Sequence, residues 1–229
     1  MKYLVPIAII VTLAVLSNAL AQDIDPAERA LEYAKGQQQN MDVLKQYSWK
    51  TRSNIMSGGN PVLTTLIQAR FDAEDKLQLT TISSETHIEK KRGFRGKKQK
   101  KELEKFGQLI ESVLSLQTAY LMMSKGQLVD FFEKATFEDG TGEMKGLQKI
   151  HGNNVLVKND QLTIWVDPST GLSQKVVIKS SLDENTIVEG TIDYKTIQDG
   201  PTTASVSILT IAAQGISIKS ERFDFIKQL

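Results

Sequence analysis

Few residues in this chain are of the types that perform catalytic or metal chemistry. Glu85, His87 and Glu89 alternate at the end of a predicted strand, so two carboxylates and an imidazole could face one metal ion. The pattern has low specificity, and the interpretation we favour is a solvated histidine among charges. His151, the other histidine, lies in a predicted turn.

Known catalytic motifs are missing from the sequence. The chain contains no cysteine and no nucleophile-elbow, zinc-protease or phosphate-loop pattern. We therefore predict a protein that is not an enzyme, with no catalytic residue, no metal site and no cofactor.

The strongest charge feature is a basic segment at residues 90–101, with eight Lys and Arg in twelve residues and no acid. Nucleic acid is not expected as a partner, because the chain carries an export signal and only Phe94 interleaves the charges. Two interpretations stay open: contact with anionic lipid head groups or an envelope protein, and a solvated helix entry that faces acidic parts of the same chain. The candidate contact residues are Lys90, Lys91, Arg92, Arg95, Lys97, Lys98, Lys100 and Lys101.

The amino terminus has the pattern of a secretory signal peptide over residues 1–21. Lys2 precedes an apolar run of thirteen residues, Leu4 to Leu16, and Ala19 and Ala21 stand at the −3 and −1 positions of a cleavage site. That run is shorter than the roughly 20 residues that span a bilayer. An exported chain without cysteine holds its fold without disulfides, which favours a bacterial periplasm.

Hydrophobic periodicity predicts three helices and about ten strands, an α+β fold. A helix capped by Asp25 should run from Pro26 to about Lys45, weakened near Gly36, and a three-stranded meander should follow. A long helix over residues 97–123 and a second one opened by a Ser124 and Gln127 capping box form a helical pair at about 97–136. From residue 137 onward, the pattern is almost wholly that of strands.

Several segments resemble a known group of proteins. The stretches ARFDAEDKLQLTTI, RGFRGKKQKKELEKFGQLI and DPSTGLSQKVVI are similar to hairpins and a loop of uncharacterised exported bacterial proteins. The order of elements resembles the periplasmic lipoprotein-carrier superfamily, the LolA-like and LppX-like proteins. The resemblance implies one domain over residues 22–229, with a curved antiparallel sheet forming an incomplete β-barrel whose concave face is covered by the helices.

A hydrophobic cavity between sheet and helices is the site that this resemblance implies. The apolar stripes are also explained by core packing alone, so an open pocket and a filled core are both compatible with the sequence. The leading hypothesis is a periplasmic carrier of a lipid, acyl chain or lipidated peptide, and the alternative is a non-enzymatic structural or protein-interaction module of the envelope. The oligomeric state stays open. The predicted cavity-lining residues are Trp49, Ile55, Ile67, Phe71, Phe106, Ile110, Val113, Phe131 and Phe132.

Overall fold

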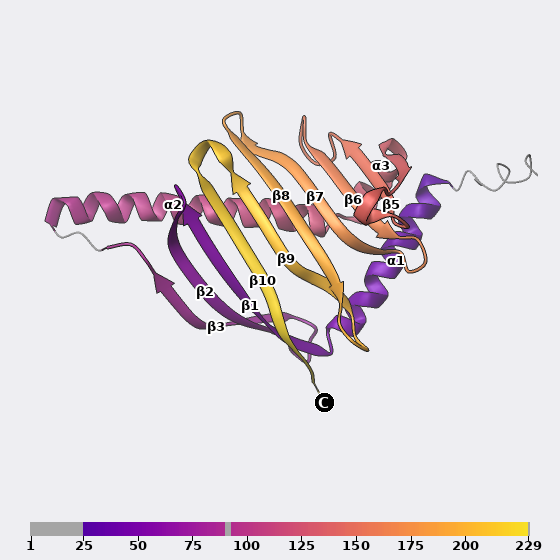
Figure 1. Cartoon of the computed structure of the whole chain (residues 1–229), viewed down its shortest axis with the longest axis horizontal. Helices are drawn as coiled ribbons and strands as arrows, with labels where there is room; N and C mark the ends of the chain where they lie inside the picture. The colour runs from indigo at the N-terminus through magenta and orange to yellow at the C-terminus, as the bar shows by residue number, and fades with distance from the viewer. Residues whose placement is uncertain (1–24, 90–92, 229) are drawn as a thin grey trace, which may run out of the picture.

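The computed structural model describes residues 25–89 and 93–228. The predicted signal peptide and three of the predicted contact residues, Lys90, Lys91 and Arg92, lie outside the described residues. Ten strands form one antiparallel sheet in the order β3-β2-β1-β10-β9-β8-β7-β6-β5-β4 (Figure 1). The strands are β1 (Tyr47–Ser57), β2 (Asn60–Phe71), β3 (Leu77–Thr86), β4 (Thr136–Asp139), β5 (Gln148–Asn153), β6 (Gln161–Asp167), β7 (Leu172–Asp183), β8 (Thr186–Thr196), β9 (Thr202–Ile211) and β10 (Ile216–Lys227).

The sheet is curled but not closed, because β3 and β4 stand at opposite ends of the strand order. Every pair of neighbours is a hairpin between consecutive strands except β1 and β10, which pair the first strand with the last, with Tyr47 opposite Lys227. The segment between β3 and β4 must therefore cross the whole sheet to join its two edges. The predicted α+β fold with an incomplete barrel is confirmed.

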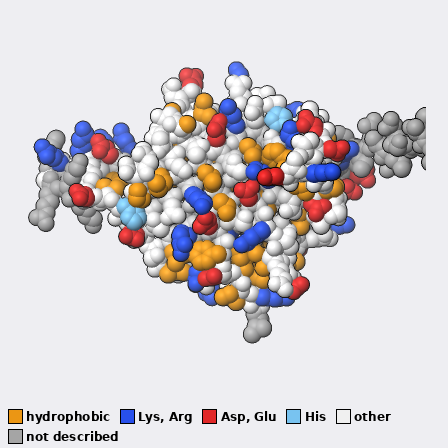
Figure 2. All heavy atoms as spheres, viewed as in Figure 1, with side chains coloured by type: hydrophobic (Ala, Val, Ile, Leu, Met, Phe, Trp, Pro, Cys, Tyr) orange, Lys and Arg blue, Asp and Glu red, His pale blue; other side chains and the backbone are white. Residues whose placement is uncertain are grey.

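Three α-helices lie on the inner face of the curl: α1 (Pro26–Leu44), α2 (Gly93–Leu121) and α3 (Lys125–Lys134). Two short 3-10 turns, Gly142–Met144 and Ala212–Gln214, complete the set of described helices. In Figure 1, α2 passes behind the strands and extends beyond β1 and β2 at one edge. The opposite face of the sheet, seen in Figure 2, has basic and acidic side chains interspersed among uncharged ones.

The helix α1 begins as predicted, because the Asp25 side chain accepts a hydrogen bond of 3.0 Å from the Ala27 amide ahead of the first turn. The helix is continuous through Gly36, where the sequence predicts a weak point, and ends at Leu44. A Cβ atom on Gly36 would lie 3.0 Å from the Thr170 carbonyl oxygen, so glycine here lets the β6–β7 turn pack against the helix.

The helical pair starts earlier than predicted. The helix α2 begins at Gly93, so the part of the basic segment that the structure describes, residues 93–101, is helical. The capping box that opens α3 is confirmed: the Ser124 amide donates to Gln127 Oε1 at 2.9 Å, and the Gln127 amide donates to Ser124 Oγ at 3.4 Å.

Buried apolar residues form two main clusters under the helices. The first joins α1, α3 and the end of α2 to β5–β8, and the second joins the middle of α2 to β1 and β8–β10. A third, smaller cluster centres on Trp49, which lies beside Phe71 and Phe225. The remaining part of the inner face, over β1–β3, has no such helical cover at its outer edge: all ten residues of β3 are exposed.

Candidate ligand-binding groove

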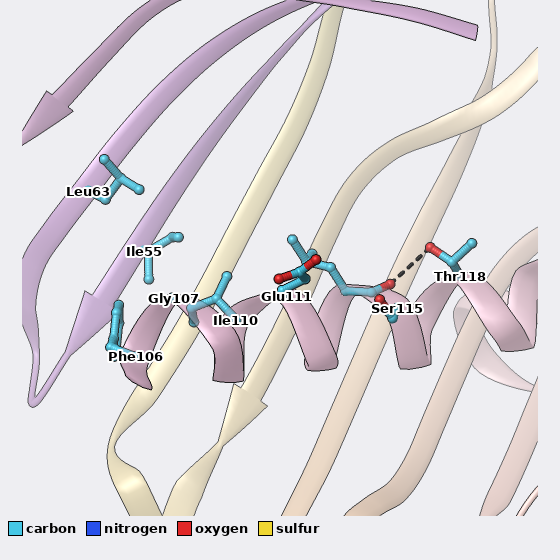
Figure 3. Close-up of a pocket in the computed structure, with 9 residues that line it drawn as sticks. Ile55, Leu63, Phe106, Gly107, Ile110, Glu111, Ser115 and Thr118 are labelled. Atoms are coloured by element: carbon cyan, nitrogen blue, oxygen red, sulfur yellow. Dashed lines mark hydrogen bonds between the residues drawn. The ribbon is translucent and has the colours of Figure 1, made fainter. Parts of the chain in front are cut away.

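An apolar groove of about 580 Å³ lies between α2 and the strands β1 and β2 (Figure 3). Phe106, Ile110 and Leu114 are four residues apart, so they follow one face of α2. Ile55 and Leu63 are paired across β1 and β2 and face them from the sheet. Gly107, Glu111, Ser115 and Thr118 complete the lining. The volume is in the range of small-molecule sites in proteins.

The groove is open to solvent because α2 overhangs the edge of the sheet. Leu103 and Leu114 on this helix are 38% and 40% exposed, although they belong to the same apolar stripe as the buried Val113. The edge strand β3 also exposes Leu77 and Leu79, but its register places them at the end of the sheet opposite the groove. The apolar surface left open at the groove is therefore that of α2, and exposed apolar surface of this kind is typical of sites that bind hydrophobic partners.

The far end of α2 is fixed by a buried polar network. The Tyr120 hydroxyl donates to the Asp160 carboxylate and shares a 2.8 Å hydrogen bond with Ser180 Oγ. The same carboxylate accepts hydrogen bonds from the backbone amides of the β5–β6 loop, including those of Leu156 at 2.8 Å and Val157 at 2.9 Å. Burial, with Asp160 adding to it, raises the pKa of Tyr120. This network holds one end of the helix. At the other end, the described contacts are exposed ones, such as the 2.7 Å hydrogen bond from the Gln99 amide to the Glu89 carbonyl.

Three of the nine predicted lining residues, Ile55, Phe106 and Ile110, do line the groove. Ile67 lies further along the same inner face and is partly exposed. Val113 does not line it, because its side chain is wholly buried in the second cluster between α2 and the sheet.

The other predicted lining residues belong to different parts of the core. Phe131 and Phe132 are buried where α3 packs beside α1, so this part of the inner face is filled by side chains. Trp49 and Phe71 pack together in the third cluster, at the opposite end of β1 and β2 from Ile55. These four residues therefore do not line the groove, because the buried side chains of the inner face are divided into separate clusters.

The sequence interpretation missed Leu63, Leu114 and the small and polar residues of the lining. The helical stripe already contained Leu114, and Leu63 starts the apolar pattern of its strand, so both had a signal. The hydrophobic pattern of the sequence did not show where the sheet beneath the helix ends.

The described basic residues lie on the first turns of α2. Arg95, Lys97, Lys98, Lys100 and Lys101 are all exposed. Two of these lysines have an acidic neighbour one turn further along the same helix: Lys98 lies 4.0 Å from Glu102, and Lys100 lies 4.0 Å from Glu104. Such exposed pairs stabilise a helix by only about 0.3–0.5 kcal/mol. The charge therefore stays accessible to an outside partner.

The histidines are held by threonines. Thr64 Oγ1 lies 3.1 Å from His87 Nε2, and the His87 ring is 3.8 Å from the Glu85 carboxylate. His151 Nδ1 lies 2.9 Å from Thr163 Oγ1. Within residues 25–89 and 93–228, no group of three or more His, Asp or Glu side chains is placed to hold a metal ion.

Solved structures similar to this chain include a DUF1329 family protein from Desulfovibrio piger, with 11% identity and a TM-score of 0.43 over 90% of this chain and 95% of the other. A domain provisionally described as an outer membrane lipoprotein-sorting protein, from Vibrio parahaemolyticus, has 12% identity and a TM-score of 0.46 over 88% and 93%. A LolA superfamily protein from Nitrosomonas europaea has 10% identity and a TM-score of 0.35 over 84% and 93%.

One of these descriptions names an outer membrane lipoprotein-sorting protein, and another names the LolA superfamily. At such low identities and TM-scores, the likeness carries no ligand or activity over to this chain. No protein-family model matches the chain, and no curated protein matches its sequence. In the described part of the chain, no helix is both long enough and apolar enough to span a membrane. The fold defines the class of protein, which is an open antiparallel barrel with helices on its inner face. The candidate site is the apolar groove at the edge of that barrel.

Proposed function

We propose that this protein is an exported binding or carrier protein that holds the hydrocarbon part of a lipid, acyl chain or lipidated peptide between α2 and β1–β2. The observation that carries the proposal is the open groove, whose helix and sheet walls are Phe106, Ile110 and Leu114 on one side and Ile55 and Leu63 on the other. Burial of the ligand's hydrocarbon surface in the groove contributes about 25 cal/mol of favourable binding free energy for each Å² removed from water.

The basic first turns of α2 support a further part of the same proposal. Lys97, Lys98, Lys100 and Lys101 are exposed on the first turns of α2, the helix that extends beyond β1 and β2 at one edge of the sheet (Figure 1). Each such residue near an anionic bilayer contributes on the order of 1 kcal/mol of attraction at low salt. In this proposal the helix brings the groove to a membrane surface, where a lipid is taken up or delivered.

The groove is tested with N-phenyl-1-naphthylamine, an uncharged fluorescent probe, and the variant Phe106→Asp. A carboxylate in an apolar groove disfavours hydrocarbon, so we expect the dissociation constant of the probe to rise at least tenfold. Leu31→Asp is the matched control, because Leu31 is an exposed leucine on α1, 55% accessible, away from the groove. Equal binding by the wild type and the Phe106→Asp variant would contradict the proposal, as would a purified protein that carries no lipid in native mass spectra and binds no probe.

A further inference from the structure

The inner face of β1, β2 and β10 changes in polarity along its length. Because alternate residues of a strand share a face, the strand register orders the inward side chains of these three strands into rows. The rows, from the groove inward, are Leu63, Ile55 and Ile218; then Thr65, Ser53 and Ser220; then Ile67, Thr51 and Arg222; and last Ala69 and Trp49.

The side chains of the second and third rows are partly accessible to solvent. Thr65, Ser53 and Ser220 are all partly exposed, and the two serine hydroxyls share a hydrogen bond of 2.8 Å. Ile67, Thr51 and Arg222 are partly exposed as well. A molecule that enters the groove at Ile55 thus meets hydroxyl groups first and a guanidinium group behind them.

Arg222 is a cation without a carboxylate partner. Among the described residues, no acidic oxygen lies within 4.0 Å of its guanidinium group, and its one hydrogen bond to them goes from Nη1 to Thr203 Oγ1 at 3.2 Å. The group lies 5.7 Å from the centre of the Trp49 ring. A guanidinium group has five N–H donors, so most of its donors are free for a ligand.

The surroundings of Arg222 are poor in water. Burial lowers the pKa of its guanidinium group, and the nearby Tyr194 acts in the opposite direction. Lysines on the outer face differ, since Lys175 and Lys179 lie 3.4 Å from Asp193 and 3.6 Å from Glu189. A partly desolvated arginine without a counter-charge favours an anion that can accept two parallel hydrogen bonds, as a carboxylate or phosphate does.

The distance between the groove and Arg222 matches an amphipathic ligand. Four residues separate Ile218 from Arg222 on β10, which is about 13–14 Å at 3.4 Å per residue. We propose that Arg222 binds the anionic head group, a carboxylate or phosphate, of a ligand whose hydrocarbon chain lies in the groove under α2. This inference rests on the proposed function and adds the charge and position of the head group.

The test compares three ligands with the same chain: hexadecanoate, hexadecyl phosphate and methyl hexadecanoate, titrated into the purified protein. Wild type should bind one or both anions at least tenfold more tightly than the uncharged ester. The variant Arg222→Gln, which keeps a donor for Thr203, should lose that preference while its affinity for the ester stays within twofold. Arg222→Lys keeps the positive charge and should retain part of the preference for the anions. This variant distinguishes a loss of charge from a disturbance of the fold.

Arg52→Gln is the matched control. Arg52 lies on β1 on the opposite face of the sheet, with its guanidinium group 5.2 Å from the centre of the Phe223 ring, and its replacement should leave all three affinities unchanged. If wild type binds the ester but has no preference for either anion, or if Arg222→Gln weakens all three ligands equally, this inference is overturned and the proposed function stands. If wild type binds none of the three, both are overturned. Tighter binding of hexadecanoate would identify the head group as a carboxylate, and tighter binding of hexadecyl phosphate would identify it as a phosphate.

Discussion

The two halves of α2 are held to the protein in different ways. In the second half, Val113 is wholly buried and Tyr120 is 3% exposed, fixed by hydrogen bonds to Asp160 and Ser180. In the first half, Leu103 is 38% exposed, and the ion pairs that the lysines form there join residues of the helix itself. One continuous amphipathic stripe is thus a core element at one end and an open surface at the other.

The difference shows how a binding surface arises from an ordinary packing pattern. The apolar stripe of α2 is covered where β1 and β8–β10 lie beneath it and is left without cover where the helix extends beyond β1 and β2 (Figure 1). Apolar area that the fold does not bury is the area that a ligand can bury. The polar anchor at Asp160 fixes the end of the helix that lies furthest from the overhang.

The largest effect should come from removing the anchor. Asp160→Ala leaves the Tyr120 hydroxyl and several backbone amides of the β5–β6 loop without an acceptor in a buried setting. We expect the free energy of unfolding, measured with urea, to fall by about 3–5 kcal/mol. Asp183→Ala is the control, since this aspartate caps an exposed turn and should cost about 1 kcal/mol. Equal losses would mean that the anchor is no stronger than a surface turn.

A smaller effect is expected at the overhang. Replacing Lys97, Lys98, Lys100 and Lys101 by Gln should weaken binding to phosphatidylglycerol vesicles at least tenfold at low salt, with little change in the free energy of unfolding. Sedimentation with vesicles measures this, and uncharged phosphatidylcholine vesicles should show no difference. The variant in which Lys50, Lys175, Lys179 and Lys219 become Gln removes four lysines that have acidic neighbours. If both variants lose the same affinity, the overhang has no special role.

The smallest effect is a pH dependence of the anchor. The folded protein raises the pKa of Tyr120 above its ordinary value near 10, so the folded state keeps a proton that the unfolded state releases. The stability that this phenol contributes is complete below about pH 10 and is lost as the pH rises further. Tyr120→Phe should therefore show a shallower loss of stability above pH 10 than wild type in urea titrations. Part of the loss should remain in the variant, because burial also raises the pKa of Tyr33 and Tyr194.

Local patterns predicted the elements of this fold well. The Ser124 and Gln127 capping box, the Asp25 cap and the period of α2 are encoded within a few residues, and each is present in the structure. The division of the inner face was not predictable in the same way. It depends on which strands lie beneath each helix, and hence on the pairing of β1 with β10 from opposite ends of the chain. Arg222 gave no local signal, because its neighbours Trp49 and Thr203 come from other strands.

The claim that the groove, and not the filled core, takes the ligand is tested most directly by methyl NMR. N-phenyl-1-naphthylamine is titrated into protein labelled at the methyl groups of isoleucine and leucine. The account predicts saturable shifts at Ile55, Leu63, Ile110 and Leu114, and none at Ile150, Ile164 and Ile178 in the first core cluster. Shifts confined to the first cluster, or no saturable shift at the groove, would contradict it.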